Sequence, residues 1–158
     1  MTSKHGLSAG EICQRVVSVA YPTLALEEAA RVMRDQHVGS LVVVEEIAPD
    51  ERMVVGMLTD RDIVTAVVAR QQPVYGMSVG DVMSRDVVTV RERDSLLDVL
   101  ATMRSKGVRR VPVVGPQRRL VGLCAIDDVL QQIAEQLQAL ATAAGAARQH
   151  ENAASARP

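Results

Sequence analysis

The chain has 158 residues and a formal net charge of −1, and 47% of its residues are hydrophobic, although phenylalanine and tryptophan are absent. This length suits one compact domain or two small ones packed closely together, with a core of short branched side chains. The balanced charge, without a basic stripe or an aromatic platform, excludes a nucleic-acid-binding surface.

No segment reaches the length of a membrane span, so we expect no membrane contact. Residues 1–10 lack the apolar stretch of a signal peptide, and two cysteines do not make a disulfide framework. We therefore expect a cytoplasmic protein.

In chain order, the first feature is an internal repeat with a spacing of about seventy residues. Residues 8–13 (SAGEIC) recur as residues 78–83 (SVGDVM). A short apolar strand follows in each copy, at 17–19 (VSV) and 88–90 (VTV). Each strand leads into a polar turn, which predicts a helix start.

Matching helices and strands come next in both copies. Apolar residues at helical spacing predict helices over 26–33 and 96–103, with Thr23 and Asp94 or Ser95 as candidate N-caps. Residues 37–44 and 107–114 then read as strands.

The stretch from Val54 to Val64 is the most informative one. It opens as a buried strand, in which Gly56 allows a bend or a close approach of another segment. Thr59 and Asp62 follow at the start of an apolar helix. They serve as helix caps, or they bind a ligand, because a helix N-terminus favours phosphate and a carboxylate can hold ribose hydroxyls.

Both copies therefore read strand, helix, strand, strand, helix. Each copy is too small for a robust core alone, so we predict an α/β (α+β) fold in which two tandem β-α-β-β-α repeats pack with pseudo-two-fold symmetry around a cleft. The predicted bounds are 8–70 for the first repeat, 71–77 for a linker, 78–135 for the second repeat and 136–158 for the end of a C-terminal helix and a frayed tail. An apolar helical stripe from Val129 to Ala144 is expected to cover the chain's own core, with fraying beyond about Ala146.

This tandem pattern resembles the cystathionine-β-synthase (CBS) domain pair, or Bateman module, in its stand-alone form. The resemblance rests on the two start segments, on the VRRVPVV strand at 108–114 and on GMLTDRD at 56–62. It implies a regulatory, signalling module that is no enzyme and that binds AMP, ADP, ATP or S-adenosylmethionine in the cleft between its repeats. It also implies a homodimer and a regulated protein partner, whose identity the sequence does not indicate.

The resemblance assigns a complete ligand set to one site only. In the family pattern the threonine and aspartate hold phosphate and ribose, and strands of the other repeat supply an apolar wall and basic residues. The corresponding residues here are Thr59, Asp62, Val88, Val108, Arg109, Arg110 and Val111. At the second site Asp128 is present, but Ala125 replaces the threonine, and Gly39 and Ser40 replace the two arginines. We therefore expect one competent site and one weak or empty site at Asp128.

Other functions have less support in the sequence. No catalytic triad order, phosphate-binding glycine loop or metal-ligand spacing is present. Cys13 and Cys124 align with apolar residues of the other repeat, so we expect buried thiols, and a redox or metal role is the less favoured interpretation. The main alternative is a dimerisation or interaction scaffold without a ligand, in which Thr59 and Asp62 are caps only.

Overall fold

The computed structural model describes residues 7–156, and its two sequence repeats form two three-stranded sheets. In each sheet the short first strand is parallel to the second, and the third is antiparallel to it. The first sheet has the order β1 (Val19–Ala20), β2 (Ser40–Ala48), β3 (Glu51–Thr59), and the second has β4 (Val90–Arg91), β5 (Arg110–Val114), β6 (Leu120–Ala125).

The helices follow the predicted pattern, with corrections at their ends. They are α1 (Ala9–Ile12), α2 (Leu26–Asp35), α3 (Asp60–Ile63), which continues as a π-helical turn (Val64–Val68), α4 (Val79–Val82), α5 (Leu96–Lys106) and α6 (Ile126–Ser155). A 3-10 turn spans Pro116–Arg118.

One predicted helix cap is confirmed and one is wrong. Ser95 caps α5, since its hydroxyl accepts from Asp98 N. Thr23 does not cap α2, which begins after Ala25 without a side-chain cap. The backbone N–H of Leu26 instead donates to Met77 O of the linker, at 2.9 Å, so a neighbouring segment takes the place of the missing cap.

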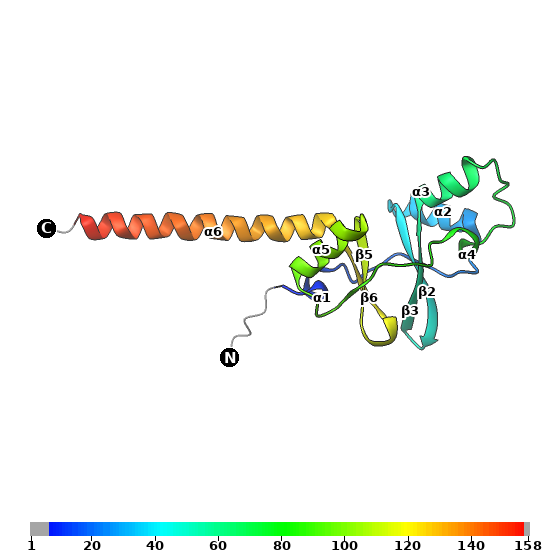
Figure 1. Cartoon of the computed structure of the whole chain (residues 1–158), viewed down its shortest axis with the longest axis horizontal. Helices are drawn as coiled ribbons and strands as arrows, with labels where there is room; N and C mark the ends of the chain where they lie inside the picture. The colour runs from blue at the N-terminus through cyan, green and yellow to red at the C-terminus, as the bar shows by residue number, and fades with distance from the viewer. Residues whose placement is uncertain (1–6, 157–158) are drawn as a thin grey trace.

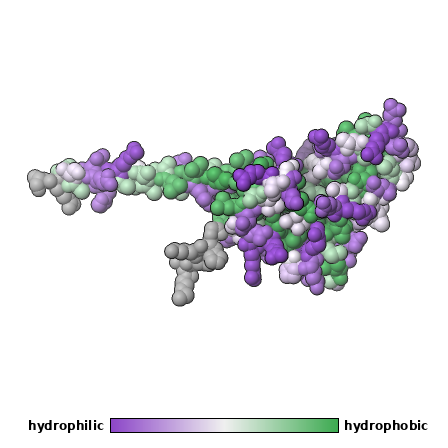
Figure 2. Space-filling model, in the orientation of Figure 1, coloured by the Kyte–Doolittle hydropathy of each residue, from purple (hydrophilic) through white to green (hydrophobic). Residues whose placement is uncertain are grey.

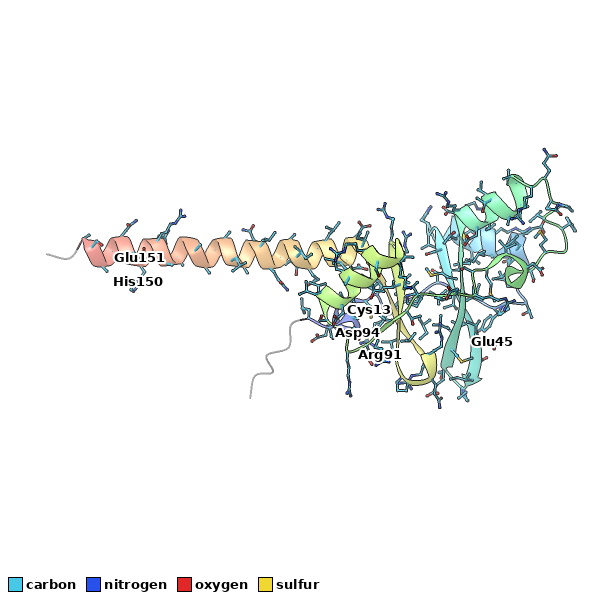
Figure 3. All side chains as sticks on the ribbon, viewed as in Figure 1. Cys13, Glu45, Arg91, Asp94, His150 and Glu151 are labelled. Atoms are coloured by element: carbon cyan, nitrogen blue, oxygen red, sulfur yellow. The ribbon has the colours of Figure 1, made fainter. Side chains whose placement is uncertain are left out.

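The start segment of each repeat packs on the other repeat. Helix α1 lies beside α5 and α6, whereas α4 lies beside α2 and α3 (Figure 1). Backbone hydrogen bonds hold each start segment on the other repeat. Gln14 and Leu123 bond reciprocally at 2.9 Å, and Met57 and Ser84 bond at 2.8 and 2.9 Å. Figure 3 accordingly places Cys13 close to Asp94 of the second repeat and far from Glu45 of the first.

Two glycines make these crossings possible. A Cβ at Gly122 would lie 2.7 Å from Gln14 O, and one at Gly56 would lie 3.1 Å from Ser84 O. Real Cβ atoms essentially never approach a backbone oxygen to 2.7 Å, and a distance of 3.1 Å requires the neighbouring segment to shift, so the lack of a side chain lets each strand pair closely with the incoming segment. The predicted close approach at Gly56 is confirmed.

The two sheets meet along a core of valines. The fully or nearly buried side chains of this contact are Val42, Val44, Val54 and Val114. Each repeat adds a separate core that includes the start segment of the other repeat. The predicted α/β architecture of two packed repeats is confirmed, and it leaves openings where strand ends of one repeat face strands of the other.

Helix α6 differs from the prediction in its second half. Val129 is fully buried and Ile133 packs on the second core, but every residue from 134 to 156 is exposed. The stripe therefore covers the core only at its start. The tail is helical to Ser155, which follows from its alanines, the strongest helix formers. No helix within residues 7–156 has the length and hydrophobicity needed to cross a membrane.

Candidate functional site

Thr59 and Asp62 join the end of β3 to the start of α3. Asp62 N donates to Thr59 Oγ1 at 3.1 Å, and Thr59 N donates to Asp62 Oδ2 at 2.8 Å. This reciprocal capping box is the structural role that the sequence left open for the pair. The acceptors in this box are Thr59 Oγ1 and Asp62 Oδ2. The other carboxylate oxygen, Asp62 Oδ1, accepts no hydrogen bond from the residues that the structure describes.

Beside this turn lies a cavity of about 580 Å³ between the two repeats. The first repeat contributes the end of β3 and the start of α3, and the second contributes the segments before β4 and at the start of β5. Of the predicted site residues, the cavity brings together Thr59, Asp62, Val88, Val108, Arg109 and Arg110.

Val111 is the predicted residue that this cavity does not include. It alternates with Arg110 along β5, so its side chain points to the opposite face of the sheet. There it is fully buried in the core of the second repeat.

The walls of the cavity combine an apolar patch with charges of both signs. Met57, Val87, Val88 and Val108 supply apolar surface. Three aspartates and three arginines line the remainder: Asp60, Asp62, Asp86, Arg61, Arg109 and Arg110. Within residues 7–156, none of these six side chains forms an ion pair. The arrangement can therefore accept a flat apolar group together with hydroxyl or anionic groups.

A second, smaller cavity of about 330 Å³ contains Asp128. Here Ala125 N donates to Asp128 Oδ2 at 2.7 Å, and Gln14 Nε2 donates to Asp128 Oδ1 at 3.1 Å. Each carboxylate oxygen of Asp128 thus accepts one hydrogen bond, and Ala125 has a methyl group where Thr59 has its hydroxyl in the first cavity.

The two cavities differ less in positive charge than expected, because Arg110 lines both of them. The second cavity was expected to lack positive charge because Gly39 and Ser40 replace the arginines. Arg110 lines both cavities, as does Ser40, whereas Gly39 lies in the first. The two residues are equivalent in the repeats, so they meet near the pseudo-two-fold axis and serve both sides.

Sequence reasoning missed the contribution of the exchanged start segments. Ser84 lines the first cavity, and Gln14, its counterpart in the repeat, reaches Asp128 in the second. The repeat alignment pairs Gln14 with Ser84, but without the exchange there was no reason to place either residue near the sites.

The two cysteines lie outside both cavities. Both are buried and unbridged, as predicted. Burial raises the pKa of both thiols, that of Cys124 to about 12, so they are protonated at neutral pH and poor nucleophiles. Among residues 7–156 there is no group of three His, Cys, Asp or Glu side chains that could hold a metal ion.

Comparison with known proteins yields consistent matches. The CBS domain family matches residues 9–69 and 79–135. Protein MK0525 of Methanopyrus kandleri is 35% identical over 125 residues, 79% of this chain. The matched part is 62% of MK0525, so this chain spans less than two thirds of that relative's length.

Solved structures show the same fold. Hypoxic Response Protein I, solved with two coordinated zinc ions, has a TM-score of 0.70 and 30% identity, over 80% of this chain and 98% of that one. The CBS domain pair of MJ0100, solved with 5′-methylthioadenosine and S-adenosyl-L-methionine, has a TM-score of 0.70 and 23% identity, over 82% of this chain and 98% of that one.

Proposed function

We propose, since this chain belongs to the CBS-domain family, that it is a regulatory module that binds an adenine nucleotide of the AMP, ADP or ATP type, or S-adenosylmethionine. The observation that carries the proposal is the 580 Å³ cavity in which Thr59 and Asp62 of one repeat face Val88, Val108 and Arg110 of the other. A ligand in this position would touch both repeats at once.

Each part of a nucleotide has a chemical counterpart in the cavity. The valines and Met57 offer an apolar slot for the adenine ring. Asp62 Oδ1 is available to accept from ribose hydroxyls, while Oδ2 stays in the capping box. The Thr59 hydroxyl and the guanidinium of Arg109 or Arg110 suit phosphate oxygens.

The second cavity is proposed to bind weakly or not at all. It lacks the threonine hydroxyl, and Gln14 Nε2 already donates to Asp128 Oδ1, where it competes with a ribose hydroxyl for the same carboxylate. The missing hydrogen bond between a threonine hydroxyl and a charged phosphate is worth about 1.5–3 kcal/mol. Arg110 reaches this side too, so the weakness rests on Ala125 and Gln14, not on missing charge.

Binding would act by shifting the population of conformers. A ligand held by Asp62 and by strands of the other repeat favours the state in which these elements are closest. A protein partner would respond to this change of conformation. We also expect a homodimer, since exposed apolar side chains remain on the helices of both repeats: Val64, Val68, Leu97 and Leu130.

A ligand screen with two matched variants tests the proposal. Thermal unfolding is measured with AMP, ADP, ATP, S-adenosylmethionine and GTP for the wild type, Asp62→Ala and Asp128→Ala. At a hundred times its dissociation constant a ligand adds about 2.7 kcal/mol, which is roughly 5–11 °C for a chain of this size. The rise should vanish in Asp62→Ala and persist in Asp128→Ala.

Both variants lose one capping bond, so each is compared with its own ligand-free melting temperature. Equal loss of the ligand effect in both variants would contradict the asymmetry. No rise with any compound would contradict nucleotide binding.

A scaffold without a ligand is the second candidate. It is favoured by the capping box, which already gives Thr59 and Asp62 a structural role, and by Ala125, which shows that one repeat keeps its fold without the hydroxyl. Absence of any ligand effect, together with a stable oligomer, would support this function.

A further inference from the structure

The distal part of α6 has no counterpart in the first repeat. The equivalent helix of that repeat ends at Val68, whereas α6 runs from Ile126 to Ser155. Figure 1 shows it projecting away from both sheets, and Figure 3 shows His150 and Glu151 standing far from every other labelled residue. No part of the described chain covers this segment.

The exposed segment carries a seven-residue repeat. Apolar residues recur at alternating spacings of three and four, and these form what we call the α6 seam: Leu130, Ile133, Leu137, Leu140, Ala144 and Ala147. Leu130, Leu137 and Leu140 are 57%, 61% and 66% exposed. Figure 2 shows hydrophobic residues gathered along the part of α6 nearest the body and hydrophilic residues toward its end.

The seam is long enough for a coiled coil. The apolar spacing holds from Leu130 to Ala147, about two and a half heptads, before Glu151 takes the next position. At 1.5 Å per residue this stretch is about 27 Å long. A helix of this length is stabilised in water mainly by packing of its apolar face, and here that face is bare.

The absence of charge along the middle of the α6 seam indicates what kind of surface pairs with it. Residues 136–147 (QLQALATAAGAA) contain no acidic, basic or histidine side chain. A partner recognised by charge would find nothing to pair with, whereas two identical helices meet without like-charge repulsion. A parallel, in-register pair sets leucine layers on leucine layers near the body and alanine layers on alanine layers beyond, so the distance between the helices changes smoothly.

We propose that the α6 seam is a self-association surface that pairs with the α6 seam of a second copy of this chain in a parallel coiled coil. Most of this surface, from Leu137 to Ala147, lies beyond the second repeat and is separate from the nucleotide cavity, whereas Leu130 also belongs to the exposed apolar surface of the repeat helices. The pairing holds two regulatory modules side by side at the base of a common stalk.

Sedimentation equilibrium of the full chain tests the proposal. The variant Leu137→Glu with Leu140→Glu places charges in the seam, and Ala139→Glu with Thr142→Glu places the same charges on the same helix outside it. We expect the seam variant to weaken association about a hundredfold or more and the control to match the wild type. All four positions are exposed, so the fold of the body is not at risk.

Crosslinking fixes the orientation. Ala147→Cys should form a disulfide between copies under mild oxidation, because equivalent seam positions face each other only in a parallel pair, and Ala139→Cys should not. A seam variant that associates like the wild type would overturn the proposal. So would a monomeric wild type, including one that binds lipid vesicles or another protein through the seam.

Discussion

Gly122→Ala is predicted to be a damaging substitution, because the glycine lies where the start segment crosses the strand. The added Cβ would lie 2.7 Å from Gln14 O and against the Cys13 thiol. Relief requires the start segment to move, and that segment is held by two hydrogen bonds of 2.9 Å between Gln14 and Leu123. Overpacking of this kind costs about 1–3 kcal/mol, and weakening two backbone bonds adds about 1 kcal/mol.

The expected loss is therefore about 2–4 kcal/mol in the free energy of unfolding, measured by urea denaturation. Gly56→Ala should cost less, because the group it meets first is the flexible end of Met83, and Ser84 O is 3.1 Å away. Gly145→Ala is the control: nothing lies within 4 Å of its Cβ, and alanine is the better helix former. If Gly122→Ala were as stable as Gly145→Ala, the exchanged start segments would be refuted.

Three further predictions concern the sites, the thiols and acid stability. Ala125→Thr with Gln14→Ser should create a second nucleotide site, raising the stoichiometry in calorimetry from one to two; an unchanged stoichiometry would contradict the asymmetry. Cys124, whose pKa burial raises to about 12, should react with maleimide at pH 7 only after unfolding, and rapid labelling of the folded chain would support a redox role. The hydrogen bonds from the Ser95 hydroxyl and backbone lower the pKa of Asp98, so this carboxylate stabilises the fold above about pH 4 and the benefit is lost as the pH falls through the lowered value. Asp98→Asn should therefore be less stable than the wild type at pH 7, and the difference should shrink as the pH falls below about 4, as judged by urea midpoints.

Local patterns predicted the elements of the fold because they depend on local physics. Short runs of apolar and β-branched residues placed the strands, and the repeat placed each element twice, so an ambiguous segment such as residues 107–114 could be compared with its partner. Ser95 was one of two candidate caps at the start of this helix, and the structure shows that it forms a local capping box with Asp98.

Long-range features could not be read in the same way. The start segment at 8–13 looks like the opening of the first repeat, and nothing local states that its partners are Leu123 and Glu92, far along the chain. Gln14 was missed for that reason. Val111 was included in the site because the strand was treated as one unit, whereas only alternate side chains of β5 face the cavity.

The crossing of the start segments sets an order of events during synthesis. Gln14 leaves the ribosome early, but its partner Leu123 emerges only about 110 residues later, a delay of roughly 6–22 s at normal translation rates. The first sheet can close sooner, because it waits only for Met83 and Ser84. During the interval Ala9, Ile12 and Cys13 of the start segment have no core to pack into, which makes this segment a natural site for chaperone binding and for misassembly between neighbouring nascent chains.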